Sequence, residues 1–163
     1  MTLREATLDD IPTLRAIALA AWPEAYRHII SPDQIAYMLE RMYGEAALRH
    51  QMAQNGHRFL IAVAEGVEVG FAGFEHAYGP QRSRLHKLYV LPDRKGKGVG
   101  HALIAAVIEE ARRAGDRSIE LNVNKRNPST AFYRRHGFAV ERDEVLDIGS
   151  GFVMDDHVMV RPI

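Results

Sequence analysis

The segment LHKLYVLPDRKGKGVGHAL, residues 85–103, determines how the surrounding chain is expected to fold. Its first part, Leu85 to Leu91, has the length and composition of a buried strand, and Pro92 ends it because proline cannot donate to a sheet ladder. Residues 94–100 form a basic, glycine-rich turn, and a helical pattern follows directly. Glycines let the backbone approach a ligand closely, and the unpaired N–H groups at a helix N-terminus attract anions. The segment therefore predicts a site for a phosphate or pyrophosphate.

Two well-known phosphate loops fit this turn less well. The nucleoside-triphosphate loop requires Gly-Lys followed by Ser or Thr, whereas Lys97 is followed by Gly98. The dinucleotide fingerprint ends in Gly or Ala, whereas the series through Gly100 ends at Leu103. Glu120 does lie about 20 residues after Gly100, where a ribose-binding acid is placed in dinucleotide folds, so a nucleotide-dependent oxidoreductase is kept as an alternative.

The same turn resembles the acyl-CoA loop of the GNAT superfamily of N-acetyltransferases. That loop has Arg or Gln, two residues, Gly, one residue, and then Gly or Ala. Lys95, Gly98 and Gly100 occupy these positions; Lys95 departs from the usual Arg or Gln, although Arg94 is adjacent.

A second block downstream is also similar to the family, which there has Asn, a short gap, Phe or Leu, Tyr, and then Gly-Phe. The matching residues are Asn127, Phe132, Tyr133, Gly137 and Phe138. Both blocks occur in the family's order and separation, so the resemblance is firm from Phe59 to Phe138 and extends to the N-terminal helices by element order alone.

The resemblance implies an α+β (α/β) fold: a mixed, mostly antiparallel twisted sheet with one parallel, splayed strand pair, flanked by helices on both faces. It implies direct transfer of an acetyl group from acetyl-CoA to a primary amine in a ternary complex. The pyrophosphate would rest on backbone N–H groups of the turn, and the pantetheine arm between the splayed strands. The expected cofactor-binding residues are Leu88, Tyr89, Val90, Lys95, Gly96, Lys97, Gly98, Val99, Gly100, His101, Asn127 and Tyr133.

Tyr133 is the expected catalytic residue, because a phenol with an ordinary pKa near 10 can donate a proton to the departing CoA thiolate. The simpler interpretation is a tyrosine packed for its ring. Asn127 would hold the pantetheine amide, cap a helix, or both, and an N–H of residues 88–90 would stabilise the oxyanion. The general base stays open; the candidates are Glu75, His76, His86, Glu120, Asp147 and a water chain.

The composition is that of an ordinary soluble protein: 163 residues, a formal net charge of zero and no cysteine. We expect one domain over residues 1–163, located in the cytoplasm, with no nucleic-acid or membrane partner. The lack of cysteine excludes an acyl-cysteine intermediate. His28, His50 and His57 lack metal-ligand spacing, so no metal site is expected. Members of this family are often homodimers.

Periodicity and cap signals place the other elements. A first helix begins at Ile11 and ends at Trp22-Pro23. A second begins at Ser31, which caps it, with Gln34 completing a capping box. The remaining helices are expected at 45–54, from the glycine turn to Gly115, and from Pro128 to Gly137. Strands are expected at 3–6, 59–64, 67–74, 85–91 and 119–123, with a turn at 78–81 and two closing strands around the break at 149–151.

The acceptor cannot be named from the sequence. Asp147, Asp155 and Asp156 are most simply solvated loop acids, but they would attract a cationic amine to the acceptor mouth, which favours a small amine such as a polyamine. Four N-terminal aromatic residues would pack in the core or line an acceptor pocket: Trp22, Tyr26, Tyr37 and Tyr43. A non-catalytic acyl-CoA-binding module is the alternative function.

Overall fold

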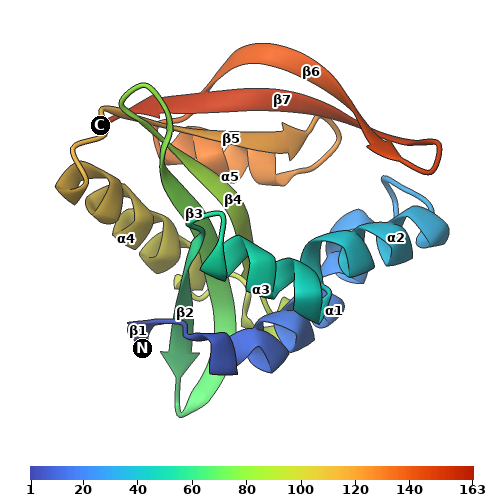
Figure 1. The fold of residues 1–163 in the computed structure, drawn as a ribbon, viewed down its shortest axis with the longest axis horizontal. Coiled ribbons are helices and arrows are strands. Elements are labelled where there is room, and N and C mark those ends of the chain that lie inside the picture. The colour runs from blue at the N-terminus through green and yellow to red at the C-terminus, as the bar shows by residue number, and fades with distance from the viewer.

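The computed structural model describes all residues, 1–163, and is built on a seven-stranded sheet in the order β1-β2-β3-β4-β5-β7-β6 (Figure 1). The strands are β1 (Thr2–Glu5), β2 (Arg58–Ala64), β3 (Val67–Gly79), β4 (Arg82–Val90), β5 (Ser118–Asn124), β6 (Ala139–Gly149) and β7 (Phe152–Pro162). Only β4 and β5 pair in parallel, and every other neighbouring pair is antiparallel. The predicted fold class is therefore confirmed.

Five α-helices cover the two faces of this sheet: α1 (Ile11–Tyr26), α2 (Pro32–Tyr43), α3 (Glu45–Ala53), α4 (Val99–Arg113) and α5 (Ser129–Arg135). Short 3-10 turns, η1 (Leu8–Asp10) and η2 (Pro92–Arg94), precede α1 and the glycine turn. None of the helices is long and apolar enough to cross a lipid bilayer.

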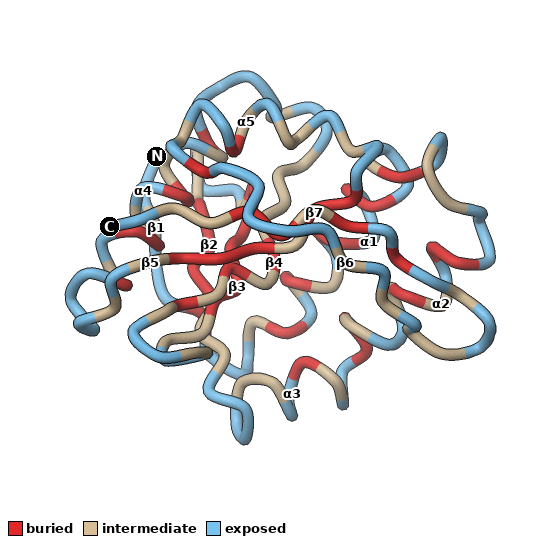
Figure 2. Tube along the Cα trace, turned by 90° about the horizontal axis from the view of Figure 1, so that it is seen from above, coloured by how far each residue is buried: buried red, intermediate tan, exposed pale blue.

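The sheet separates two apolar cores. Along β2, Phe59 and Ile61 pack with α1, α2 and α3, whereas the alternate residues Leu60 and Ala62 pack with α4 and α5. This is the period-two alternation of a strand buried on both faces. Figure 2 shows buried residues concentrated on the central strands, while β6 at the edge is largely exposed.

α1 continues through Pro23 to Tyr26, so the predicted end at Trp22-Pro23 was wrong. Pro23 cannot donate the intrahelical bond and typically costs about 3 kcal/mol in a helix interior. Trp22 and Tyr26 are both buried against the sheet, and burial of each large side chain offsets about 1.5–3 kcal/mol. Tertiary packing therefore outweighs the local signal.

Two further predictions need correction. Ser31 caps α2 by accepting from the Gln34 backbone N–H at 3.1 Å, but the Gln34 side chain donates to the Val153 carbonyl at 2.9 Å and so does not complete a capping box. The turn expected at 78–81 is tighter, because β3 extends to Gly79 and β4 already begins at Arg82. Gly79 pairs with Arg82 in the antiparallel ladder, so only Pro80 and Gln81 connect the two strands of the hairpin.

Candidate active site

A cavity of about 520 Å³ opens where the parallel strands part. The β4–β5 ladder runs from Arg82 paired with Ser118 to Leu85 paired with Leu121, and then stops. Beyond it β4 stays with β3 up to Val90, while β5 stays with β7. The two strands are thus splayed, which leaves the edge of each open to the cavity.

A bulge in β4 accompanies the separation. Phe74 of β3 faces Leu85, and the preceding Gly73 faces Lys87, so His86 is an extra residue in β4. Bulges bend a strand and increase its twist. The close approach at this point requires glycine, because a Cβ on Gly73 would lie 2.7 Å from Cε1 of Phe59.

The glycine turn forms the second wall of the cavity. Gly96 and Gly98 have φ angles of +76° and +83°, a region that L side chains rarely adopt. The first intrahelical bond of α4 runs from Ala102 N–H to the Gly98 carbonyl at 3.0 Å. The N–H groups of Val99, Gly100 and His101 therefore have no intrahelical acceptor and carry the positive end of the helix dipole. This arrangement can hold a phosphate.

α5 brings Tyr133 to the opposite wall. The turn before α5 is held by Asn127, whose Oδ1 accepts from the Ser129 N–H at 2.9 Å. Tyr133 is 9% exposed and lines the cavity. Burial, with a smaller contribution from Tyr26, raises the pKa of its phenol. Tyr133 therefore stays protonated at neutral pH and can act as a proton donor.

The cavity gathers every residue that was expected to bind the cofactor except one. Lys97 is exposed and does not line the cavity. The lining residues from that set are Leu88, Tyr89, Val90, Lys95, Gly96, Gly98, Val99, Gly100, His101, Asn127 and Tyr133.

Several lining residues were not expected from the sequence, among them Lys87, Asn122, Arg135 and His136. Period-two alternation along β5 could have placed Asn122 on the face opposite Leu121. Lys87 is nearly fully buried, donates to Gln51 Oε1 at 2.6 Å, and burial lowers its pKa to about 7. No local pattern indicates such a buried lysine.

Tyr26 and Tyr89 join α1 to β4 at the cavity wall, with their hydroxyl groups 2.9 Å apart. Burial is the main reason that the pKa of each phenol is raised. Of the four N-terminal aromatic residues, only Tyr26 lines the cavity, whereas Trp22 and Tyr43 are core residues. Tyr37 instead donates to the Ile148 carbonyl at 2.7 Å.

A buried carboxylate lies beside the cavity on the face covered by α1 and α2. Asn122 lines the cavity and donates to Asp156 Oδ2 at 3.3 Å and to Glu144 Oε2 at 3.0 Å. Asp156 is 4% exposed, its Oδ1 has no hydrogen-bond partner, and burial raises its pKa. This pair of acids can receive a cation.

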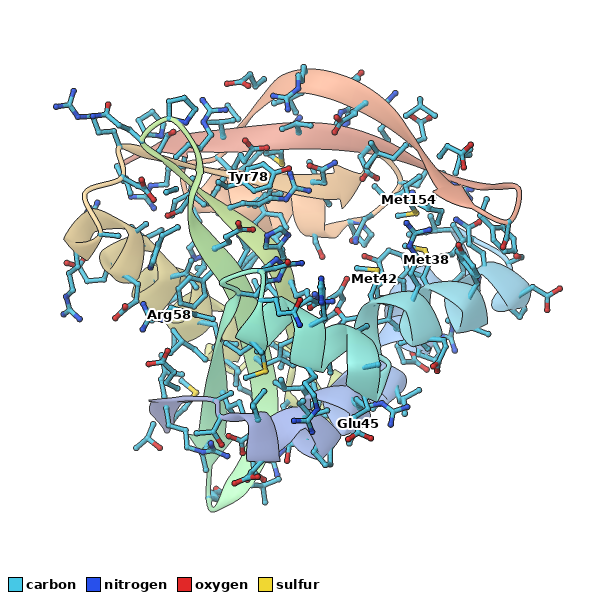
Figure 3. The ribbon with its side chains drawn as sticks, in the orientation of Figure 1. Met38, Met42, Glu45, Arg58, Tyr78 and Met154 are labelled. Carbon is cyan, nitrogen blue, oxygen red and sulfur yellow. The ribbon has the colours of Figure 1, made fainter.

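The other tail acids have separate roles. Asp155 is exposed and pairs with Lys125 at 2.8 Å, and Asp147 is exposed and accepts from the Gly149 N–H in the β6–β7 turn. Met38 of α2 and Met154 of β7 lie close to one another (Figure 3) and belong to the same apolar core.

The structure separates the base candidates. His86 lines the cavity, and its Nε2 lies 2.9 Å from Glu75 Oε1. His76 instead contacts Ser83 Oγ at 2.9 Å. Glu120 accepts from Arg84 at 3.2 Å and does not line the cavity, so its carboxylate is engaged in an ion pair.

Comparisons with known proteins agree with this geometry. A family model described as acetyltransferase (GNAT) domain matches residues 27–154. The chain is 25% identical over 158 residues to spermidine N(1)-acetyltransferase of Thermoplasma acidophilum, covering 94% of each chain. It is 34% identical over 125 residues to aminoglycoside N(6')-acetyltransferase type 1 of Stenotrophomonas maltophilia, covering 72% of each. Its fold matches the crystal structure of PaiA N-acetyltransferase from Thermoplasma acidophilum in complex with coenzyme A, with a TM-score of 0.82, 22% identity and full coverage of both chains.

Proposed function

The chain belongs to the GNAT family of N-acetyltransferases, and from this premise we propose that it transfers the acetyl group of acetyl-CoA directly to the primary amine of a small cationic acceptor. The single observation that carries the proposal is the cavity between the splayed strands β4 and β5, because it joins the glycine turn to Tyr133. Family membership takes precedence over the oxidoreductase alternative, and the ion pair of Glu120 also argues against a ribose-binding role.

In this proposal the glycine turn binds the diphosphate of the coenzyme. The free N–H groups of residues 99–101 and the dipole of α4 supply the positive potential. The side chains of Arg94 and Lys95 line the same end of the cavity and add charge. The pantetheine arm lies along the open edge of β4 and places the thioester near Leu88, Tyr89 and Val90.

The amine nitrogen then attacks the thioester carbon, forming a C–N bond and a tetrahedral oxyanion. An N–H group of β4 donates to this oxyanion; a donor of this kind is typically worth about 3–4 kcal/mol. The C–S bond breaks, and the thiolate takes the phenolic proton of Tyr133. The proton of the attacking amine leaves to a base or to water, and the Tyr133 phenolate regains a proton from solvent.

Asp156 and Glu144 support a cationic acceptor. The Asp156 carboxylate is buried beside the cavity with one oxygen unpartnered, so it can accept a hydrogen bond from an ammonium group. Two of the relatives are named for acetylation of spermidine and of an aminoglycoside, both of which carry several amines. A homodimer and a cytoplasmic location stay predictions.

The test is an acceptor screen with acetyl-CoA, scored by free CoA thiol. The panel contains spermidine, an aminoglycoside, neutral amino-acid amides and a peptide with a free N-terminus. We expect thiol release with the polycationic amines above the rate of hydrolysis. If no amine promotes release while the chain still binds CoA, the chain is a non-catalytic acyl-CoA-binding module and the proposal is wrong.

A further inference from the structure

Two histidines and one glutamate from three separate segments converge beside the cavity. His57 precedes β2, Glu75 lies on β3, and His86 is the bulge residue of β4. The Glu75 Oε1 atom is 3.3 Å from His57 Nε2 and 2.9 Å from His86 Nε2. One ligand atom from each side chain lies within 4.8 Å of the other two. We propose that these three residues form a binding site for a divalent transition-metal ion such as Zn²⁺.

The donor set suits such an ion. Two imidazole nitrogens and one carboxylate oxygen are the three protein ligands of many zinc sites that keep a fourth position open. Hard cations such as Ca²⁺ and Mg²⁺ prefer oxygen ligands alone and would not select this set. The side chains of His57, Glu75 and His86 are 11%, 25% and 17% exposed, so water can reach the fourth position.

The three groups contact one another in the metal-free protein, and the Glu75 carboxylate accepts from His86 Nε2 at 2.9 Å, so a metal ion would replace that proton. His57 Nδ1 is buried without a hydrogen-bond partner, whereas Nε2 lies 3.3 Å from Glu75 Oε1, so a metal ion at Nε2 would take the place of a proton held between this ring and the carboxylate. The two neighbouring cations are engaged elsewhere, because Lys87 donates to Gln51 and Arg84 donates to Glu120.

Binding also requires one of the two rings to turn. The rings of His57 and His86 are stacked, with centroids 4.0 Å apart and planes 14° apart. An ion in the plane of one ring cannot lie in the plane of the other, so one imidazole must turn about its Cβ–Cγ bond. The ring of Tyr78, labelled in Figure 3, lies edge-on to the His86 ring with the two centroids 5.8 Å apart, which favours His57 as the ring that turns.

An ion held here would have consequences for the cavity. It would tie the bulge of β4 to β3 and to the segment before β2. Because His86 also lines the cavity, the ion would place positive charge at the cavity wall. The proposal does not depend on acetyl transfer, and its test measures the metal alone.

The test uses the tag-free chain, dialysed against Zn²⁺, with metal content measured by mass spectrometry and affinity by calorimetry. We expect one Zn²⁺ per chain and a higher melting temperature with the metal. Loss of an outer-sphere partner alone weakens metal sites by about 10–100-fold, so His57→Gln, Glu75→Gln and His86→Gln should each weaken binding at least tenfold. Circular dichroism checks that each variant is folded.

A second histidine pair provides the matched control. His101 Nδ1 lies 2.9 Å from His136 Nε2, but no carboxylate completes that pair. The double variant His101→Gln/His136→Gln should keep the stoichiometry and affinity for Zn²⁺. Co²⁺ in place of Zn²⁺ should give a visible absorption band that Glu75→Gln alters. Absence of bound metal, or metal that is lost in the double variant and kept in Glu75→Gln, would overturn the proposal.

Discussion

Leu85 of β4 and Leu121 of β5 form the last pair of the parallel ladder, and the cavity begins directly beyond them. Both side chains are buried in the core under α4, so this end of the ladder is fixed by packing. The bulge at His86 follows one residue later on β4. A rigid junction followed by a bulge is a simple way to hold two neighbouring strands apart over the length of a ligand.

Replacing Tyr133 by Phe tests the proton donor. The ring contacts with Phe132 and Phe138 are kept, so the fold and the CoA affinity should change little. Turnover should fall by about 10²–10⁴-fold, because the thiolate would leave without a proton from the enzyme. Steady-state kinetics and CoA calorimetry on the same preparation provide the measurement, and unchanged turnover would remove Tyr133 from this role.

Replacing Gly98 by Ala tests the turn. At a φ of +83° a Cβ costs about 1–2 kcal/mol, and the strained turn should present its N–H groups less well to the diphosphate. Gly56→Ala is a matched control, because Gly56 has a φ of +70°, open space around its Cβ position and no part in the cavity. Both variants should lose similar stability, but only Gly98→Ala should weaken CoA binding. Equal CoA affinities would argue against the turn as the anion site.

Replacing Asp156 by Asn tests the buried carboxylate. Its pKa is raised in the folded protein, so the native state binds this proton more tightly than the unfolded state does. This group therefore favours folding below the ordinary aspartate range and opposes it as the pH rises through the raised pKa. Asp156→Asn should consequently melt at a higher temperature than the parent at neutral pH, and the difference should shrink in acid.

The same variant should bind cationic acceptors less well, with KM raised at least about tenfold. Removal of one partner of a buried charge pair usually costs about 2 kcal/mol or more of binding free energy, which exceeds a tenfold change in affinity. Asp155→Asn is the control, because that exposed neighbour pairs with Lys125 outside the cavity. A similar KM for both variants, or a lower melting temperature for Asp156→Asn, would contradict the assignment.

Replacing Gly73 by Ala tests the packing behind the bulge. The added Cβ would meet the Phe59 ring at 2.7 Å, and this ring is fully buried. Overpacking of this kind typically costs about 1–3 kcal/mol. Urea denaturation measures the free energy of unfolding, and a neutral effect would show that β3 can move away from Phe59.

The glycine turn and the helix that carries Tyr133 could be predicted from the sequence because their signals are local. Lys95 to Gly100 and Asn127 to Phe138 lie within continuous segments, and glycine, proline and cap residues mark their ends. Pro23 shows the limit of this approach, because burial of Trp22 and Tyr26 decides against its local preference.

The acceptor side could not be predicted because strand register assembles it. Asn122, Glu144 and Asp156 come from three strands and meet only through the β5–β7 and β6–β7 pairings. The contact between Glu75 and His86 depends on a bulge in β4; Gly70 and Gly73 in β3 indicate a bulge or close packing nearby, but not which residue of β4 is the extra one. The general base that accepts the proton of the amine could not be identified from the sequence for the same reason.

The central claim is that the turn from Lys95 to Gly100 holds the diphosphate of coenzyme A between the splayed strands. Isothermal titration calorimetry of the unmodified chain with CoA tests it most directly. We expect saturable binding of one CoA per chain, with competition by acetyl-CoA. The absence of any binding heat at high protein concentration, confirmed by equilibrium dialysis, would contradict the claim.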